Sequence, residues 1–552
     1  YRRRDLLGMM LYVDAFAGDL KGVEEKLPYL RECGVNYLHL MPLLESPKGR
    51  SDGGYAVSDF RTVQPRLGTM ADLEQLADAC RKKKMSLCLD FVMNHTSEDH
   101  AWAKKARAGE PGYRERYFFY DSWDIPREFE KTVPQVFPTT APGSFTQLDN
   151  GQIVMTNFYP YQWDLNYANP VVFNDMTENL LFLANRGIDV IRLDAIPYIW
   201  KKLGTNCRNL PQVHTLARML RMVCEIVCPS VLLLGEVVME PAKVAPYFGT
   251  PDKPECHMLY NVTTMATTWH TLATGDVSLL KRQMEAVCSL PKDFLFLNYL
   301  RCHDDIGWGL DYPWLQERFH IFEVAHKKYL NDWFTSRWPG SPARGELYND
   351  DPRLGDARLC GTTASLCGLE AANFEGDPFK LERAVSCDLT LHAWMLSQSG
   401  IPVIYSGDEV GRFNDYTYHD DPDKREDSRY IHRGAFQWEL AERRSDPDTY
   451  QGKLFQGLRR LEELRAGEPC FDARAEVHVE DSGDSRVLAL CRRLGDRELV
   501  CLFNFSSQFV YAGVNREGGY TELMYGTKYD NIRSIELWPN GFAWLLRDGQ
   551  EA

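Results

Sequence analysis

The first 240 residues or so alternate between two patterns of apolar and polar positions. Short, almost continuously apolar runs are typical of strands buried on both faces, and they are followed by longer runs with the three-to-four-residue spacing of helices. Parallel strands joined by crossover helices produce this rhythm. In this part of the chain, the runs that predict strands lie at residues 9–14, 36–40, 86–92, 188–193 and 231–234, and two more lie at 294–300 and 401–405.

Residues typical of helix starts precede two of the helices between these strands. Thr69 with Asp72 three residues later indicates a helix start, and Asn169-Pro170 opens another helix because proline is favoured at the first helical position. The helices expected in this part of the chain lie at 20–33, 69–84, 169–187 and 210–227.

Two long irregular segments and the end of the chain interrupt the rhythm. Residues 97–166 and 306–371 each follow a strand, and we expect them over the carboxyl ends of the strands, where barrel enzymes bind substrate. The last 80 residues or so contain short alternating strands. The predicted fold class is therefore α/β: a (β/α)8 TIM barrel with two long inserted loop domains and a C-terminal antiparallel β-sandwich. The expected boundaries are 1–92, 169–305 and 373–474 for the barrel, 93–168 for an inserted B domain, 306–372 for the second insertion and 475–552 for the sandwich.

Composition narrows the class of protein. The 552 residues are 44% hydrophobic and 26% charged, as expected of a globular protein, and the net charge of −15 without a long Lys/Arg block argues against nucleic-acid or anionic-membrane partners. No apolar run is long enough to span a membrane. The 15 cysteines form no regular framework, which indicates free thiols in the cytoplasm. Because the first residue is Tyr1 rather than Met, a secreted form stays open as the alternative.

Polar residues gather where apolar strands stop. Any one of them could be a helix cap or a satisfied core residue. Four such groups in succession, each at the carboxyl end of a barrel strand, predict one shared pocket. The groups are Asp90 with Asn94-His95, Arg192 with Asp194, Glu236, and His303-Asp304-Asp305.

This combination suits the cleavage of a glycosidic bond. One carboxylic acid must protonate the leaving oxygen. In a retaining enzyme, a second carboxylate about 5–5.5 Å away attacks the anomeric carbon. Adjacent barrel strands can hold two side chains at that separation.

The four groups, in this order, resemble the four short regions shared by the α-amylase superfamily, glycoside hydrolase family 13. Further stretches resemble the amylosucrase and sucrose hydrolase subgroup, and this resemblance covers essentially the whole chain. We expect the helical N-terminal domain of amylosucrases to be absent or truncated before Tyr1. The stretches are 12–22 (YVDAFAGDLKG), 51–57 (SDGGYAV), 162–167 (QWDLNY), 406–411 (SGDEVG) and 427–429 (DSR).

The resemblance implies a role for each residue. Asp194 would be the nucleophile, Glu236 the general acid and base, and Asp304 the stabiliser of the oxocarbenium-like transition state. Arg192, two residues before Asp194 on one strand face, would keep the nucleophile ionised. The other expected substrate-binding residues are Tyr55, which would stack on the glucosyl ring, His95 and His303, which would donate hydrogen bonds, Asp305, Arg358, and Asp52 and Arg429, which would form a salt bridge closing the pocket floor.

The acceptor side departs from the amylosucrase pattern. Pro197 and Tyr198 follow the nucleophile, and Val237 and Val238 follow the acid/base, where amylosucrases typically have smaller or different residues. These positions are expected to line the leaving-group and acceptor site, so they bear on the product and leave the donor chemistry intact.

The sequence therefore predicts an amylosucrase-like enzyme that cleaves sucrose, releases fructose and transfers glucose to an α-glucan or another sugar acceptor. Transfer to water, as in a sucrose hydrolase or α-glucosidase, is the alternative, and a catalytically inactive sugar-binding protein is disfavoured because all three carboxylates are present. No cofactor and no metal are expected, with Asn94 structural rather than a calcium ligand. The protein is expected to be a monomer or homodimer.

Overall fold

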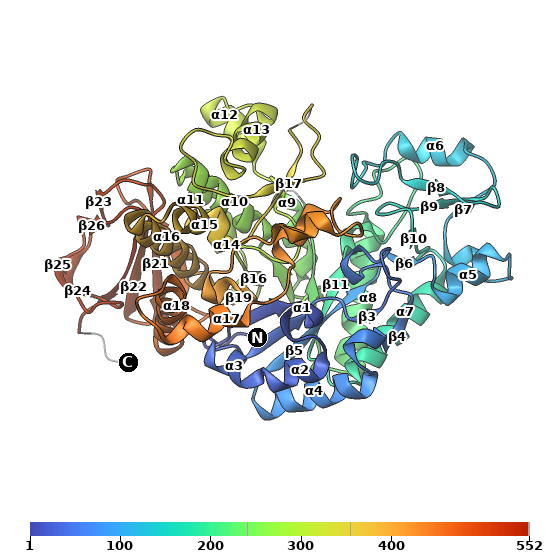
Figure 1. Ribbon diagram of the computed structural model, residues 1–552, viewed down its shortest axis with the longest axis horizontal. Coiled ribbons are helices and arrows are strands. Elements are labelled where there is room, and N and C mark those ends of the chain that lie inside the picture. Colours follow the sequence, from blue (N-terminus) through green and yellow to red (C-terminus); the bar gives the residue numbers. More distant parts are fainter. Residues whose placement is uncertain (240, 354, 550–552) are drawn as a thin grey trace. The chain divides into compact units, whose positions relative to one another are not determined.

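A computed structural model describes residues 1–239, 241–353 and 355–549 (Figure 1). Eight strands close into a barrel in the order β1-β19-β16-β15-β12-β11-β5-β2, which confirms the predicted (β/α)8 fold. The barrel strands are β1 (Gly8–Leu11), β2 (Tyr37–Leu40), β5 (Ser86–Val92), β11 (Val190–Asp194), β12 (Leu232–Gly235), β15 (Met258–Tyr260), β16 (Leu295–Asn298) and β19 (Gly400–Tyr405).

The chain divides into two compact units, each of which is described by itself. The amino-side unit comprises Leu11–Pro28 and Asn36–Tyr260. The carboxyl-side unit comprises Tyr1–Met10, Tyr29–Val35 and Asn261–Ala552.

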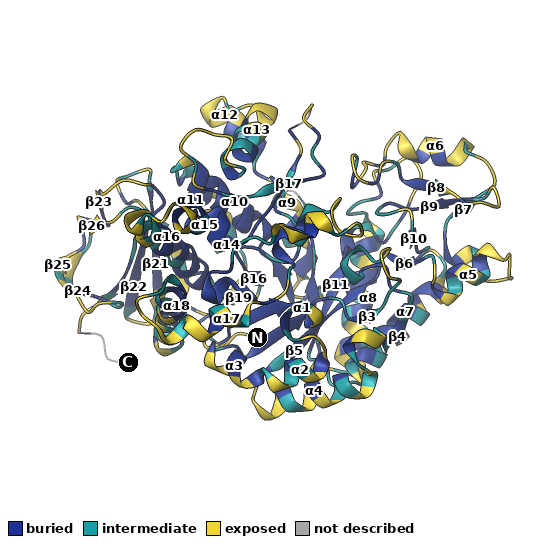
Figure 2. Cartoon of the chain, viewed as in Figure 1, coloured by how far each residue is buried: buried dark blue, intermediate teal, exposed yellow. Residues whose placement is uncertain are grey.

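In the amino-side unit, β11 lies between β5 and β12 in a parallel arrangement, with Arg192 opposite Asp90 on one side and Leu234 on the other. All residues of β2 and β11 are buried, because helices cover a parallel sheet on its outer face. Helix α4 (Met70–Lys82) is one of these helices. It begins with the predicted capping box of Thr69 and Asp72, and Figure 2 shows its buried and exposed faces.

Several local predictions were wrong in detail. The strand expected at 9–14 ends at Leu11, because Tyr12 is already the N-cap of helix α1 (Val13–Ala17). The helix expected at 20–33 is two helices, α2 (Leu20–Glu25) and α3 (Leu27–Glu32), and Pro28 lacks the N–H that a continuous helix would need. The barrel strand β15 was not predicted, since a run of three residues carries little periodic signal.

The two irregular segments contain regular structure. The first holds the three-stranded sheet β7-β9-β8, formed by β7 (Phe119–Tyr120), β9 (Ile153–Met155) and β8 (Phe145–Gln147). The second holds helices α12 (Tyr312–Phe319) and α13 (Glu323–Phe334). The sequence suggested loops because these elements are short and rich in aromatic residues. The domain boundaries themselves stay predictions.

The C-terminal part confirms the predicted antiparallel β domain. Its sheet has the order β20-β21-β22-β27-β24-β25, and a separate ladder pairs β23 (Val510–Ala512) with β26 (Ile535–Leu537). All 15 cysteines are free thiols, most of them buried. Within the described residues, we find no helix with the length and apolar character needed to cross a membrane. The six sheet strands are β20 (Glu476–Glu480), β21 (Val487–Leu494), β22 (Arg497–Asn504), β24 (Glu517–Glu522), β25 (Lys528–Asn531) and β27 (Phe542–Arg547).

Candidate active site

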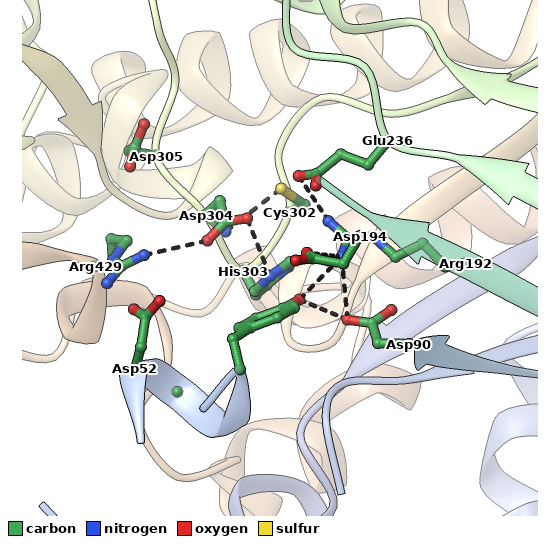
Figure 3. A network of polar contacts seen from close by, with 12 residues as sticks. Asp52, Asp90, Arg192, Asp194, Glu236, Cys302, His303, Asp304, Asp305 and Arg429 are labelled. Carbon is green, nitrogen blue, oxygen red and sulfur yellow. Dashed lines mark hydrogen bonds and ion pairs between the residues drawn. The ribbon is translucent and has the colours of Figure 1, made fainter. Parts of the chain in front are cut away.

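The carboxyl ends of β5, β11 and β12 bring together the side chains of Asp90, Arg192, Asp194 and Glu236 in the amino-side unit (Figure 3). Arg192 and Asp194 are two residues apart on β11 and therefore point to the same face. Glu236 directly follows β12, and its backbone N–H donates to the carbonyl oxygen of Leu193 at 3.1 Å. Pairing between neighbouring strands thus sets the spacing of the four charged groups.

Arg192 is the centre of this group. Its Nη1 lies 2.6 Å from Asp194 Oδ1, and its Nη2 lies 2.7 Å from Glu236 Oε1. The Asp90 carboxylate lies farther away, with Oδ2 at 3.4 Å from Nη1. The Arg192 side chain is only 2% exposed, so these charge-assisted contacts operate with little screening by water. One guanidinium group therefore holds the predicted nucleophile and the predicted acid/base at the same time.

Glu236 has a second anchor next to the nucleophile. The backbone N–H of Ala195 donates to Glu236 Oε2 at 2.9 Å. Ala195 has φ 48° and ψ 33°, the left-handed region that residues with a Cβ seldom adopt. Such conformations concentrate at functional sites because the surrounding structure must hold them. Here the unusual backbone directs a donor at the predicted acid/base.

Burial, together with the nearby charge of Glu236, raises the pKa of Asp194 well above its ordinary value, and Arg192 opposes this effect. The raised pKa favours the neutral form of Asp194, whereas nucleophilic attack needs its carboxylate. Arg192, whose Nη1 lies 2.6 Å from Asp194 Oδ1, is the group that favours this carboxylate.

Asp90 is more central than its sequence position suggested. His39 Nε2 lies 2.7 Å from its Oδ1, and the Tyr55 hydroxyl donates to its Oδ2 at 2.5 Å. The Tyr55 ring also lies 5.6 Å from the guanidinium carbon of Arg192. His39 was not predicted; a polar residue in the middle of the apolar run 37–40 was the available signal. Whether Tyr55 stacks on a sugar stays a prediction.

His95 lies in the same unit as a neutral imidazole. Burial lowers its pKa to about 4. Its Nε2 lies 3.2 Å from the Tyr55 carbonyl oxygen, and the Asn94 amide lies 3.2 Å from its Nδ1. With a carbonyl acceptor on one side and an amide donor on the other, the proton resides on Nε2. His95 is therefore fixed beside the backbone of Tyr55.

A buried ammonium group occupies the neighbourhood of Asn94. Lys201 Nζ donates to Asn94 Oδ1 at 2.7 Å, and it lies 2.8 Å from Asp164 Oδ2, with both charged side chains fully buried. The carbonyl oxygen of Tyr198 also accepts from it. The ammonium group of Lys201 thus already contacts the oxygen atoms around Asn94. This contact supports a structural role for Asn94. Lys201 was not singled out from the sequence.

His303 and Asp304 form a second cluster, within the carboxyl-side unit (Figure 3). His303 Nε2 lies 3.1 Å from Asp304 Oδ2, and Arg433 Nη2 and Arg429 Nη1 lie 3.2 and 3.5 Å from Oδ1. Burial acts to raise the pKa of Asp304, but His303 and the two guanidinium groups outweigh it and hold the pKa well below its ordinary value. Asp304 is therefore an ionised carboxylate. Arg433 was missed because it lies outside the short motif around Arg429.

Three side chains of this cluster lie close enough together to be considered as metal ligands. Cys302, His303 and Asp304 each offer one ligand atom, and these atoms lie within 4.8 Å of one another. The positive groups of Arg429 and Arg433 already face Asp304, which disfavours a divalent cation there. We therefore keep the prediction that no metal is needed.

Asp305 and Arg358 lie within the same unit, with Arg358 Nη1 at 3.6 Å from Asp305 Oδ1. Burial raises the pKa of Asp305. Arg429 is held by Asp427, with Nη2 at 2.7 Å from Asp427 Oδ2. Asp52, in the amino-side unit, accepts from Gln162 Nε2 at 3.1 Å. The salt bridge between Asp52 and Arg429 would connect the two units, and it stays a prediction.

The predicted acceptor residues differ in exposure. Pro197 and Val237 are buried, Tyr198 is half-buried and Val238 is 54% exposed. The Tyr198 ring lies 5.3 Å from that of Phe158, in an edge-to-face arrangement. Their contact with an acceptor stays a prediction.

The family model for the α-amylase catalytic domain matches residues 8–305. The chain belongs to the α-amylase family. Among curated members, a trehalose synthase/amylase of Mycolicibacterium smegmatis is 31% identical over 71% of this chain and 60% of its own length. A trehalose synthase of Pimelobacter sp. is 30% identical over 71% of this chain and 63% of its own. The chain thus spans about 60% of the length of these two relatives.

Other α-amylase family members match over more of their length. A glucosylglycerate phosphorylase of Allomeiothermus silvanus is 29% identical over 87% of this chain and 81% of its own. The crystal structure of a trehalulose synthase from Pseudomonas mesoacidophila MX-45 has a TM-score of 0.74, with 20% identity over 99% of both chains, which shows a common fold. These relatives carry names other than amylosucrase, so membership of the amylosucrase subgroup stays a proposal.

Proposed function

We propose that this protein is a retaining enzyme of the α-amylase family that cleaves an α-glucoside through a covalent β-glucosyl-enzyme on Asp194. The observation that carries the proposal is the position of Arg192, whose two terminal nitrogens hold Asp194 and Glu236 at 2.6 and 2.7 Å. This buried cation favours the carboxylate form of Asp194, which attack on the anomeric carbon requires. The same group also restrains both carboxyl groups near one point.

The first half-reaction uses both groups at once. The Asp194 carboxylate attacks the anomeric carbon while the bond to the leaving oxygen breaks, and Glu236 gives its proton to that oxygen. The products are a glucosyl ester on Asp194, a free alcohol and a Glu236 carboxylate. Loss of its proton leaves Glu236 with two anchored oxygens, one on Arg192 and one on the Ala195 amide.

The second half-reaction reverses these roles. Glu236 takes the proton of an acceptor hydroxyl, whose oxygen attacks the anomeric carbon and displaces Asp194. Two inversions leave the α configuration unchanged. Asp304, kept anionic by His303, Arg429 and Arg433, would stabilise the positive charge that develops on the sugar.

For the donor and acceptor, we propose sucrose and a sugar hydroxyl, as in amylosucrases. The sequence stretches around Asp52, Gln162 and Arg429 support this choice, because a floor closed by a salt bridge would admit one glucosyl unit. The named activities of the relatives suggest how the acceptor could change. The relatives are named as a trehalose synthase, a trehalulose synthase and a glucosylglycerate phosphorylase, and a phosphorylase uses phosphate as its acceptor. Phosphorolysis is therefore the second candidate, favoured by the glucosylglycerate phosphorylase, which matches over 81% of its length.

The test is the product profile from sucrose alone, with a maltooligosaccharide added and with inorganic phosphate added. Longer α-glucans together with free fructose would support the proposal. Glucose 1-phosphate formed only with phosphate would identify a phosphorylase, and free glucose in every mixture would identify a hydrolase. If sucrose is not consumed under any of these conditions, sucrose is not the donor, and a panel of α-glucosides should replace it.

A further inference from the structure

A buried ion pair of the carboxyl-side unit lies directly before the cluster of His303 and Asp304. Arg301 follows β16 in the chain, and Asp408 begins the short helix η6 (Asp408–Val410) that follows β19. Arg301 Nη2 donates to Asp408 Oδ1 at 2.7 Å, and its Nε donates to the same oxygen at 3.1 Å. The two side chains are 1% and 2% exposed. A pair of charges shielded from water therefore ties together the loops that follow two neighbouring strands.

Both partners of this pair have further contacts. The Thr363 hydroxyl donates to Asp408 Oδ2 at 2.9 Å, so that each oxygen of this carboxylate accepts a hydrogen bond. The guanidinium carbon of Arg301 lies 4.4 Å from the centre of the Tyr405 ring, in a cation–π arrangement. These contacts restrict the directions that the two charged side chains can take. The ion pair is thus a fixed point in the fold rather than a flexible contact.

A second anchor holds the chain two residues farther on. The carbonyl oxygen of His303 accepts from Arg433 Nε at 2.7 Å and from His432 Nε2 at 3.0 Å. His432 can donate there because its Nδ1 accepts from the Gly361 N–H at 3.1 Å, which places the ring proton on Nε2. The backbone that leads into Asp304 is therefore held at two points, one on either side of a single residue.

The Asp304 carboxylate is the exposed end of this buried framework (Figure 3). Its side chain is 28% exposed, whereas the side chains of Arg301, His303 and Arg433 are each 1% exposed. The groups that lower the pKa of Asp304 most are His303, Arg433 and Arg429. Arg301 therefore acts on this carboxylate through the position of the backbone more than through its charge.

We propose that Arg301 is a positioning residue for Asp304, and that it acts by holding the loop after β16 against Asp408. In this role Arg301 does not contact the substrate. Its ion pair fixes where the Asp304 carboxylate stands in the transition state, and a displacement of about 1 Å can lower a rate about 100-fold. The inference rests on the proposed function, in which Asp304 stabilises the positive charge that develops on the sugar.

The alternative is that the pair of Arg301 and Asp408 only stabilises the fold. Removing one partner of a buried pair leaves the other charge without its partner, whereas replacing both partners by apolar residues removes both charges and recovers much of the stability. Combining Arg301→Met with Asp408→Leu therefore separates the two roles. If the pair only stabilises the fold, kcat recovers together with stability. If the pair positions Asp304, stability recovers and kcat stays low, because apolar contacts do not fix the direction of the loop.

The test compares Arg301→Met, Asp408→Leu and the doubly substituted protein by thermal unfolding and by steady-state kinetics on sucrose and on 4-nitrophenyl α-glucoside. The doubly substituted protein should unfold at a higher temperature than either single variant. In all three proteins, kcat should fall by about tenfold or more and KM should change by less than about threefold, because Asp304 acts in the transition state. Arg497→Met is the matched control, because it breaks another ion pair of the same unit, with Glu468 at 2.8 Å, and should lower stability without lowering kcat.

A crystal structure of the doubly substituted protein provides a readout that does not depend on turnover. The Asp304 carboxylate should have moved away from Arg429 and Arg433. If the doubly substituted protein does not fold, Arg301→Lys takes its place, because lysine keeps the charge but cannot repeat the contact through two nitrogens.

Two results would overturn the proposal: a kcat within about threefold of wild type in the doubly substituted protein, or an Asp304 carboxylate that keeps its position in the crystal structure. Failure of the proposed function would look different, because the unsubstituted protein would then turn over neither donor. In that case the crystal structure still decides whether Arg301 positions Asp304.

Discussion

At the scale of single residues, the site depends on one cation, Arg192, that contacts two carboxyl groups at once. Arg192 contacts Asp194 and Glu236 almost equally, so the difference in their roles must come from their other partners. Glu236 receives the Ala195 amide in addition. Asp194 lies deeper, with a side chain 10% exposed against 17% for Glu236. The Ala195 N–H stabilises the Glu236 carboxylate that remains after proton transfer, and the deeper burial of Asp194 makes its charge depend more on Arg192.

Asp194→Asn and Glu236→Gln should each lower kcat by several orders of magnitude while the fold is kept. Each change preserves size and hydrogen bonding but removes the nucleophile or the transferable proton. Steady-state kinetics on the donor and circular dichroism measure the two effects. Asp189→Asn is the control, because Asp189 accepts from the Leu87 N–H and belongs to the scaffold. Activity within tenfold of wild type in either site variant would refute the assignment.

Lys201→Met should lower the free energy of unfolding by about 3–5 kcal/mol, because it leaves the Asp164 carboxylate buried without its cation. Chemical denaturation measures the loss. The exposed neighbour Lys202, changed to Met, should have an effect below about 0.5 kcal/mol. Combining Lys201→Met with Asp164→Asn should recover part of the loss. If the single variant is as stable as wild type, the ammonium group is not essential to this cluster.

At the scale of elements, the turn after β11 links the nucleophile to the acid/base. β11 ends at Asp194, and the short helix η4 (Ile196–Tyr198) begins two residues later. Ala195 makes the change of direction in a left-handed conformation. This strained conformation directs the Ala195 N–H toward Glu236.

Ala195→Val should destabilise the protein by about 1–3 kcal/mol and lower kcat more than it changes KM, because a β-branched residue resists this conformation. Ala195→Gly should keep stability within about 1 kcal/mol of wild type, since glycine adopts positive φ readily. Thermal unfolding and steady-state kinetics compare the pair. The idea fails if valine and glycine behave alike.

The segment after β19 contains a pH-sensitive carboxyl group. Glu409 accepts from the Tyr29 hydroxyl at 2.8 Å and from the Gly407 N–H at 2.7 Å, yet burial raises its pKa from 4.5 to about 7. The folded state therefore binds this proton more tightly than the unfolded state does. Its contribution to stability is complete below pH 4.5 and is lost as the pH rises toward 7.

Glu409→Gln should remove a decrease in the free energy of unfolding on the order of 3 kcal/mol between pH 5 and pH 8. Urea denaturation at several pH values measures the slope. Glu439→Gln, at an exposed position, should keep the wild-type slope. An unchanged slope in Glu409→Gln would mean that Glu409 titrates alike in the folded and unfolded states.

At the scale of the whole molecule, the proposed reaction draws on both compact units. Asp194 and Glu236 belong to the amino-side unit, whereas His303, Asp304 and Arg429 belong to the carboxyl-side unit. The strands of the closed barrel come from both units.

Asp52 and Arg429 provide a test at this scale. If they form the predicted salt bridge, a double-mutant cycle of Asp52→Ala and Arg429→Ala on sucrose kcat/KM should show a coupling energy above about 1 kcal/mol. Asp427→Ala paired with Asp52→Ala is a useful comparison, because Asp427 holds Arg429 from within the carboxyl-side unit. If the effects of the two substitutions are additive, Asp52 and Arg429 do not interact. A closed pocket then no longer supports sucrose as the donor. The assignment of the three carboxylates would stand.

The sequence by itself determined the barrel, the C-terminal β domain and the positions of the strand-end carboxylates. Apolar periodicity and strand-end polarity are local properties, and residues such as Asp194 and Glu236 can be read from them. The sequence did not predict the three-residue strand β15, because so short an apolar run has no measurable periodicity.

Only the tertiary structure decided which groups share a partner. Arg192 touches both Asp194 and Glu236, His39 holds Asp90, and Lys201 fills the oxygen cluster around Asn94. These contacts join residues between 2 and 107 positions apart in the chain. Their energies depend on distance and burial, and a linear sequence specifies neither quantity until the strands are paired.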